Sequence, residues 1–302
     1  MSRRVLTGQA PGRLTPSAPG GRVIIPVGPP YRLDRTLTSG QCFRWTVTGG
    51  SASGVVDGTV AVVEQDARGL AVAWGGPPGD PARLGRHLGA DQPLDAVEAA
   101  LARDPVLRSM LPLTSGTALM RQDPWECLVS YVISAFNNIP KIRLSIGRLA
   151  RALGSPIGPA GGAWTFPGPD RLAGARLDVL RACALGYRAR SVRALARLVA
   201  DGEVDLDAIG RLPLTEARAA LLELPGVGEK VADCVLLFAF GRTEAFPVDV
   251  WVQRAVERWY FGGRAKTPRA IRAWASERFG ALAGYAQQHL FVGARLLELG
   301  AS

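Results

Sequence analysis

A short glycine-containing turn between two helical patterns is the feature that most constrains how this chain can fold. The turn reads Leu224-Pro225-Gly226-Val227-Gly228 and lies between apolar residues at helical spacing over 215–222 and 229–240. Proline fixes φ and the two glycines permit a tight hairpin whose backbone amides face outward at a helix N-terminus. Because the helix dipole favours an anion there, the segment predicts a helix–hairpin–helix that holds one DNA phosphate. The alternative is a plain turn between helices.

Two ionisable side chains follow this turn. Lys230 lies in the first turn of the second helix, where the dipole disfavours a cation and makes a neutral amine easier to reach. A neutral lysine amine is a good nucleophile toward an electrophilic carbon, although a lysine that only pairs with phosphate fits the local sequence equally well. Asp249, after Pro247, is expected to cap the next helix, and its second oxygen can face developing positive charge on a sugar.

The pattern of the chain changes from β-type to helical along its length. Residues 22–76 contain short β-type runs separated by turn dipeptides, which is typical of an antiparallel meander. We expect an α+β protein with a flexible leader over 1–21, an antiparallel twisted β domain over 22–115 and an all-helical region over 116–302. A helix that starts at Pro93 is expected to end near Pro105. Further helices are expected at 123–136, 139–153, 170–184, 188–201, 206–211, 215–222, 229–240, 250–260, 267–279 and 282–299.

Charge and cysteine placement narrow the class of function. The chain has 36 Lys+Arg against 26 Asp+Glu, a surplus of +10 that indicates an anionic partner, with nucleic acid the leading candidate. No apolar run is long enough to span a membrane, and the N-terminus lacks the apolar core of a secretion signal. Four scattered cysteines favour a reduced compartment, the bacterial cytoplasm with its nucleoid or a eukaryotic nucleus. We expect a monomer without a metal ion or cofactor.

The run LPGVGEKVADCVLLFAFGRTEAFPVDVW over 224–251 resembles the helix–hairpin–helix, Gly/Pro-Asp superfamily of base-excision DNA glycosylases, and in particular its 8-oxoguanine branch. Four further segments agree, in the family's order, at 37–45, 121–127, 186–190 and 285–291. The resemblance implies a bifunctional DNA glycosylase and AP lyase that acts on a flipped nucleotide. It makes Lys230 the nucleophile at C1′ and Asp249 the essential carboxylate, with a Schiff base that permits β-elimination on the 3′ side.

The resemblance also implies a binding site for the damaged base. The carbonyl of Gly40 would accept a hydrogen bond from N7, which carries a hydrogen in 8-oxoguanine and only a lone pair in guanine. Cys234 and Phe291 would sandwich the base, and Gln287 would read its Watson–Crick edge. Without the resemblance, Gly40 would be an ordinary turn glycine, and the cysteine and phenylalanine would be core residues.

Contacts to the DNA strands are implied in the same way. Members that demand cytosine opposite the lesion carry Asn and Arg where this chain has Phe136 and Lys141. Phenylalanine can stack but makes no hydrogen bond, and lysine lacks a planar bidentate fork, so we expect a relaxed opposite-base preference. Tyr187 is expected to be a wedge or a half-buried aromatic, and Arg188 matches a retained contact to cytosine. The implied DNA contacts are Gly226, Val227, Gly228, Asn137, Lys141, Tyr187 and Arg188.

Two other functions fit parts of the sequence. A non-catalytic helix–hairpin–helix module needs only the turn, and a monofunctional glycosylase for alkylated bases hydrolyses the base without a lysine. The pairing of Lys230 with Asp249 favours the bifunctional enzyme over both. Gly40, Gln287 and Phe291 favour it over the module, because a binding module needs none of them.

Overall fold

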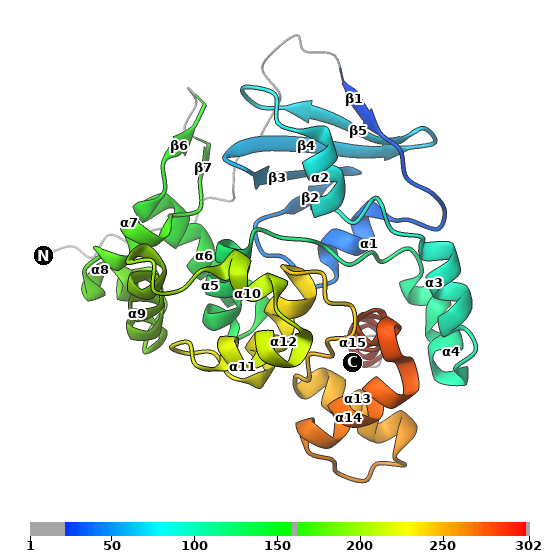
Figure 1. Cartoon of the computed structure of the whole chain (residues 1–302). Coiled ribbons are helices and arrows are strands. Elements are labelled where there is room, and N and C mark those ends of the chain that lie inside the picture. The colour runs from blue at the N-terminus through cyan, green and yellow to red at the C-terminus, as the bar shows by residue number, and fades with distance from the viewer. Residues whose placement is uncertain (1–21, 159–161, 300–302) are drawn as a thin grey trace, which may run out of the picture.

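The computed structural model describes residues 22–158 and 162–299, so the leader predicted over 1–21 lies outside the described residues. A five-stranded antiparallel sheet forms one end of the molecule and helices dominate the other (Figure 1). The strands, in the spatial order β1-β5-β4-β3-β2, are β1 (Val23–Ile25), β5 (Gly69–Trp74), β4 (Thr59–Asp66), β3 (Ser51–Val56) and β2 (Thr46–Thr48). The predicted α+β class, with an N-terminal antiparallel sheet before a helical region, is confirmed.

Hairpin turns connect consecutive strands from β2 to β5, as the turn dipeptides predicted. Gly49-Gly50 and Asp57-Gly58 both have positive φ at their two central residues, which matches the right-handed twist of the flanking strands. The β-type runs in the sequence lie at 23–27, 43–47, 59–63 and 70–74. They do not include strand β3, and β2 begins later than the run at 43–47. Helix α1 (Leu33–Thr38) was also missed because its threonines are poor helix formers, and burial of Leu33 and Leu37 holds it in place.

The helix expected from Pro93 ends just before Pro105, but the sequence did not indicate that this proline starts a second helix. Helix α3 (Leu94–Leu101) ends before it, and α4 (Pro105–Thr114) begins at the proline. Asp104 caps α4, since its Oδ1 accepts hydrogen bonds from the amides of Val106 at 2.9 Å and Leu107 at 3.1 Å. A proline at the first helical position loses no bond, because the amide it lacks would have no partner inside the helix.

The remaining helices follow the predicted ranges closely, with one exception. The helix predicted over 170–184 is divided at Gly174, which ends α7, into two short helices. A helix α2 covers the sheet beside β1, and a small β6–β7 hairpin follows α6. The elements are α2 (Pro81–His87), α5 (Pro124–Ser134), α6 (Ile139–Leu153), β6 (Pro156–Ile157), β7 (Ala163–Trp164), α7 (Pro169–Ala173), α8 (Leu177–Ala182), α9 (Arg188–Ala200), α10 (Leu206–Arg211), α11 (Leu214–Leu222), α12 (Glu229–Phe238), α13 (Val250–Tyr260), α14 (Pro268–Phe279), η1 (Gly280–Leu282) and α15 (Ala283–Leu299).

The segment at 39–41 is fixed between three parts of the molecule. The buried side chain of Gln41 donates to the carbonyl of Ala118 at 2.8 Å and accepts from the amide of Met120 at 2.8 Å. The Tyr131 hydroxyl on α5 donates to the Gln41 carbonyl at 2.9 Å, and Gln288 Nε2 on α15 donates to the Ser39 carbonyl at 3.1 Å. Gly40 is thereby held against the helical region, although it belongs to the N-terminal part of the chain.

The helices between the sheet and residue 115 contact the C-terminal end of the chain. Helix α15 lies against α4 as well as against α13 (Figure 1). The division of the chain into domains at 115/116 therefore stays a prediction. Within the described ranges, no helix combines the length and the apolar character needed to cross a bilayer.

Candidate active site

The predicted helix–hairpin–helix is formed by α11, the turn at 224–228 and α12. Gly226 has a φ of +83°, and a Cβ added there would lie 2.7 Å from the Cβ of Ser191, so both its conformation and its surroundings require glycine. Val227 is buried and anchors the turn, whereas Gly226 and Gly228 are exposed. The turn therefore leaves backbone open to an anion directly before the first residue of α12.

Lys230 does not extend into solvent from the start of α12. Its side chain is half-buried, and Nζ donates a hydrogen bond to Oγ of Ser134 at 3.0 Å. The amine also lies 4.8 Å from the centroid of the Tyr131 ring. Both partners belong to the buried helix α5, so the amine is directed inward with a defined orientation.

Asp249 caps α13, as its position before a helical pattern predicted. Its Oδ1 accepts a hydrogen bond from the amide of Val252 at 2.9 Å. Burial raises the pKa of the Asp249 carboxyl above its ordinary value, while the Val252 amide and the positive charge of Lys230 act in the opposite direction. The carboxylate is therefore close enough to the Lys230 amine for the two charges to interact.

Gly40 and Phe291 meet although 251 positions separate them in the sequence. A Cβ added to Gly40, whose φ is +90°, would lie 3.0 Å from Cε1 of Phe291 and 3.2 Å from Cδ1 of Ile139. Any larger residue would displace the aromatic ring, so the close approach requires glycine. The structure thus brings together two of the four residues that the resemblance assigned to the damaged base.

Gln287 and Cys234 are buried polar groups in the same region. Gln287 lies one turn before Phe291 on α15, is 5% exposed, and its Oε1 has no hydrogen-bond partner among the described residues. Burial raises the pKa of the Cys234 thiol to about 12, and the nearby charges of Lys230 and Asp249 act on the same thiol. The thiol stays neutral at physiological pH, and the amide oxygen is left available to a ligand.

Besides the turn at 226–228, the predicted DNA-contacting residues lie around the start of α6 and of α9. Lys141 is exposed in the first turn of α6, and half-buried Asn137 donates to the carbonyl of Ile133 at 3.3 Å. Phe136 is 98% exposed with a φ of +50°, and Tyr187 is 66% exposed. Two large aromatic side chains in water are unusual and indicate a surface that binds a partner.

Arg188 has a structural role that the sequence did not indicate. It is 7% exposed, and its guanidinium donates to the carbonyls of Ala135, through Nε at 2.8 Å, and of Phe136, through Nη2 at 3.1 Å. The guanidinium carbon also lies 4.5 Å from the centroid of the Tyr187 ring. Arg188 thus fixes the loop that presents Phe136 and supports Tyr187, and its contact with DNA stays a prediction.

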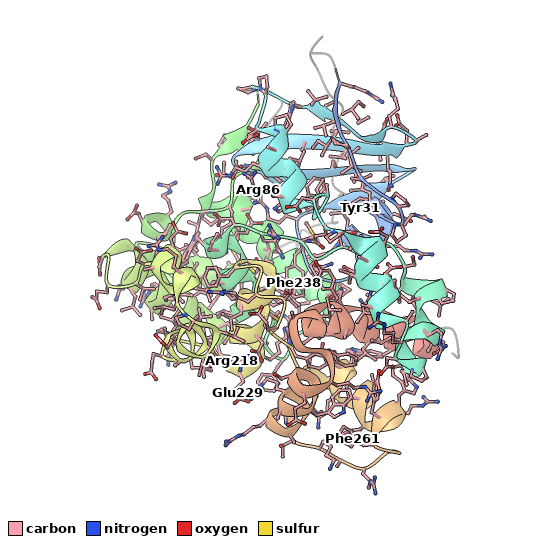
Figure 2. The ribbon with its side chains drawn as sticks, turned by 45° about the vertical axis from the view of Figure 1, so that its right-hand side comes forward. Tyr31, Arg86, Arg218, Glu229, Phe238 and Phe261 are labelled. Carbon is pink, nitrogen blue, oxygen red and sulfur yellow. The ribbon has the colours of Figure 1, made fainter. Side chains whose placement is uncertain are left out.

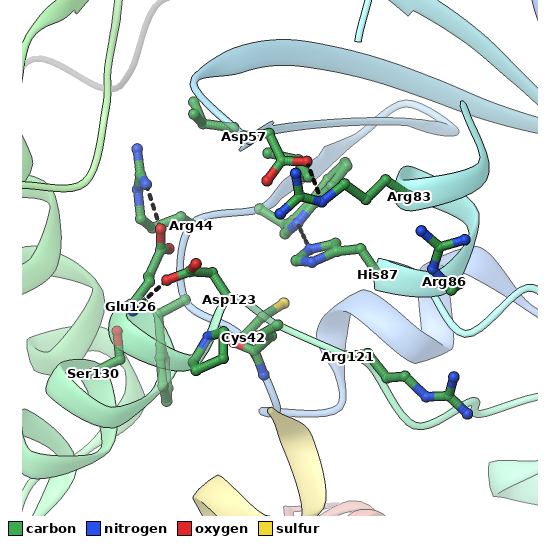
Figure 3. A pocket seen from close by; sticks show the side chains of 16 residues that line it. Cys42, Arg44, Asp57, Arg83, Arg86, His87, Arg121, Asp123, Glu126 and Ser130 are labelled. Atoms are coloured by element: carbon green, nitrogen blue, oxygen red, sulfur yellow. Dashed lines mark hydrogen bonds and ion pairs between the residues drawn. The ribbon is translucent and has the colours of Figure 1, made fainter. Parts of the chain in front are cut away.

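A pocket of about 230 Å³ lies elsewhere, between α2, the β3–β4 hairpin and the start of α5 (Figure 3). Two ion pairs line it, since Arg44 pairs with Glu126 at 2.8 Å and Arg83 with Asp57 at 3.1 Å. None of the predicted site residues lines it. The pocket lies at the junction of the sheet and the helices and is separate from the candidate active site.

Three residues of the candidate site were missed by sequence reasoning. Tyr131 and Ser134 contact the Lys230 amine, but nothing in their local pattern connects them with a residue almost a hundred positions away. Arg295 lies over the Phe291 ring, 5.3 Å from its centroid. Its spacing of four residues from Phe291 was the one available signal, because that spacing places both side chains on one helix face.

Sequence models of two protein domains match this chain in succession. The model described as "8-oxoguanine DNA glycosylase, N-terminal domain" matches residues 24–128, and "HhH-GPD superfamily base excision DNA repair protein" matches residues 129–280. The chain belongs to the HhH-GPD superfamily of base excision DNA repair proteins. In this HhH-GPD protein the two matches meet inside α5, the helix that carries Tyr131 and Ser134.

Relatives of this HhH-GPD protein include enzymes with two named activities. A probable N-glycosylase/DNA lyase of Methanothermobacter thermautotrophicus is 36% identical over 196 residues, which are 58% of this chain and 62% of that protein, less than two thirds of its length. N-glycosylase/DNA lyase OGG1 of Arabidopsis thaliana is 31% identical over 280 residues, covering 86% of this chain and 76% of the relative.

A solved structure also resembles this HhH-GPD protein over most of its length. It is the Clostridium acetobutylicum 8-oxoguanine glycosylase/lyase in complex with double-stranded DNA that contains cytosine opposite 8-oxoguanine. The two are 30% identical with a TM-score of 0.83, covering 89% of this chain and 93% of that one. The family and the branch predicted from the sequence are confirmed.

Proposed function

We propose that this chain is a bifunctional DNA glycosylase and AP lyase that excises 8-oxoguanine from duplex DNA. The observation that carries the proposal is the Lys230 amine, which is turned inward to Ser134 and lies beside Asp249 and Cys234. The glycosylase/lyase names of the relatives, and the 8-oxoguanine DNA bound by the Clostridium protein, support the same activity and substrate.

In the proposed reaction, the lone pair of Lys230 Nζ forms a bond to C1′ of the flipped nucleotide as the bond to the base breaks. The electron pair of the broken bond leaves with the base. Asp249 takes a proton from the attacking amine or stabilises the positive charge that develops on the sugar. The Ser134 hydroxyl, which accepts a hydrogen bond from the amine, orients Nζ before attack. Opening of the sugar gives a Schiff base, from which β-elimination releases the 3′ phosphate.

In the proposed base site, Gly40 supplies the carbonyl that distinguishes N7–H of 8-oxoguanine from the bare N7 of guanine. A buried acceptor left unpaired opposite guanine costs about 1–3 kcal/mol, which disfavours the normal base. The neutral Cys234 thiol and the Phe291 ring enclose the base, and Gln287 offers its unpaired Oε1 to the Watson–Crick edge.

We infer that stacking, rather than hydrogen bonding, sets the preference for the base opposite the lesion. The exposed ring of Phe136 has no polar group, and the guanidinium of Arg188 is already bonded to two carbonyls of its own chain. Tyr187 would fill the space that the flipped base leaves. These features support a weak distinction between cytosine and adenine opposite the lesion.

The proposed partner is double-stranded DNA, bound by a monomer through the exposed turn at 226–228 together with Asn137, Lys141, Tyr187 and Arg188. We place this activity in the cytoplasm at the nucleoid of a bacterium, or in the nucleus of a eukaryote. The proposed domains are a β domain over 22–115 and a helical glycosylase region over 116–302. No cofactor takes part in the proposed reaction.

Borohydride trapping tests the proposed function, because it reduces a Schiff base to a stable covalent bond. We expect a covalent adduct on a duplex with one 8-oxoguanine, none on the matched guanine duplex, and loss of the adduct with Lys230→Gln. Lys266→Gln is the matched control and should retain it. No adduct with the wild-type protein would contradict the lyase activity, and full strand cleavage by Lys230→Gln would favour the monofunctional alternative.

A further inference from the structure

Arg295 is a half-buried cation at the edge of the proposed base site. Its guanidinium carbon lies 5.3 Å from the centroid of the Phe291 ring, and its Nη1 would be 3.5 Å from a Cβ added to Gly40. Its charge also acts on the Asp249 carboxyl. Arg295 therefore lies between the residue proposed to recognise the base and the residue proposed to act at C1′.

No ion pair among the described residues neutralises the charge of Arg295. Arg44 has the carboxylate of Glu126, and Arg272 that of Asp233, within 4.0 Å, whereas no such pair includes Arg295 among the side chains that the structure describes. A guanidinium that is partly removed from water and lies over an aromatic ring keeps its N–H donors for another anion.

A flipped nucleotide brings two such anions, since its sugar carries a phosphate on each side. The Arg295 guanidinium lies beside Gly40 and Phe291, so in the proposed complex it lies next to the flipped nucleotide and within reach of one of these phosphates. An arginine binds phosphate through two parallel hydrogen bonds, which fixes orientation as well as adding affinity.

We propose that Arg295 binds one of the two phosphates that flank the flipped nucleotide, and that its stacking on Phe291 positions that ring against the damaged base. The inference rests on the proposed function, because it needs the nucleotide to be extruded into this site. It assigns to α15 a contact with the DNA backbone in addition to the reading of the base.

A double-mutant cycle between the side chain and the phosphate tests this contact. Binding is measured by fluorescence anisotropy in a Lys230→Gln background, so that the 8-oxoguanine duplex stays intact. Three duplexes are compared: the natural one, and two in which a neutral methylphosphonate replaces the phosphate on the 5′ or the 3′ side of the lesion. We expect one methylphosphonate to weaken binding about tenfold when Arg295 is present, as for one lost charge-assisted contact.

Arg295→Met should weaken binding to the natural duplex by a similar factor. In this variant, the methylphosphonate that weakens binding when Arg295 is present should change the dissociation constant by no more than about twofold. Arg295→Lys, which keeps the charge, should retain part of the coupling. Arg86→Met is the matched control, because Arg86 lies on α2 beside the sheet, away from Glu229 at the start of α12 (Figure 2), and it should leave the coupling unchanged.

The outcomes separate this inference from the proposed function. Independent, additive losses for both methylphosphonates would overturn the phosphate contact, as would a loss with Arg295→Met that appears only in the preference for 8-oxoguanine over guanine. If the Lys230→Gln protein bound 8-oxoguanine duplex no more tightly than undamaged duplex, the proposed function itself would fail.

Discussion

At the scale of single residues, the candidate site places a helix cap, Asp249, near the proposed nucleophile, Lys230. Asp249 serves two purposes, since one oxygen caps α13 while its charge interacts with that of Lys230. Because burial raises the pKa of Asp249, its ionised form is lost at a higher pH than for an aspartate in water. The activity of the site should therefore depend on pH through this carboxyl.

Asp249→Asn tests the dependence on pH. We expect wild-type single-turnover excision to fall as the pH drops through the raised pKa of Asp249, above the ordinary value near 4. The asparagine variant should be slower by about a hundredfold or more and should lose this acidic limb, while its amide still occupies the cap. An unchanged acidic limb in the variant would assign the titration to another group.

A second prediction for single residues concerns Phe136 and the base opposite the lesion. We expect the wild-type protein to excise 8-oxoguanine opposite cytosine and opposite adenine at rates that differ by less than about 100-fold, or roughly 2.7 kcal/mol. Phe136→Asn with Lys141→Arg should raise the ratio in favour of cytosine, because it supplies hydrogen-bonding groups to the opposite strand. A wild-type ratio above that limit would contradict the role given to stacking.

At the scale of elements, α12 is held in place by a buried carboxylate near the proposed nucleophile. Asp233, fully buried and three residues after Lys230, pairs with Arg218 of α11 at 2.5 Å and lies 3.8 Å from Arg272 of α14. Glu229 pairs with the same Arg272 at 2.7 Å but is half exposed. Figure 2 labels Arg218 and Glu229 among the helices, away from the sheet. Through these two arginines, Asp233 connects α12 with α11 and with α14.

Asp233→Asn should therefore lower the free energy of unfolding by about 3 kcal/mol at pH 8, because it leaves the partly buried Arg218 guanidinium without its carboxylate. Glu229→Gln is the matched control on the same arginine and should cost less than about 1 kcal/mol, as expected for an exposed pair. Denaturant unfolding of both variants measures the difference. Equal losses would show that burial does not determine the contribution of this network.

The elements also show what the sequence could predict and what it could not. Helix α6 was predicted with its observed ends from apolar residues at helical spacing, and in the structure Asn138 caps it. The division at Gly174 and the helix start at Pro105 were missed, since the same residue types stop or start helices according to tertiary context. The contacts of Lys230 with Ser134 and of Arg188 with the carbonyls of 135–136 join distant segments, which no local pattern specifies.

At the scale of the whole molecule, the candidate site is assembled from both ends of the chain. Gly40 comes from the segment that the N-terminal domain model matches, whereas Lys230 and Asp249 come from the HhH-GPD part. Hydrogen bonds from α5 and α15 to residues 39–41 join the two parts at the site. In the proposed reaction, recognition of the base therefore depends on the packing of the two parts against each other, and the placement of the nucleophile depends on the hairpin.

The identity of the attacking amine is the central claim, and the sequence makes it unusually easy to test. The chain has three lysines, Lys141, Lys230 and Lys266, so few amines compete to form the Schiff base. The most direct measurement is mass spectrometry of the borohydride-trapped complex after digestion of the protein and the DNA. The account predicts that the sugar remnant is attached to Lys230, and attachment to Lys141, to Lys266 or to the N-terminal amine would contradict it.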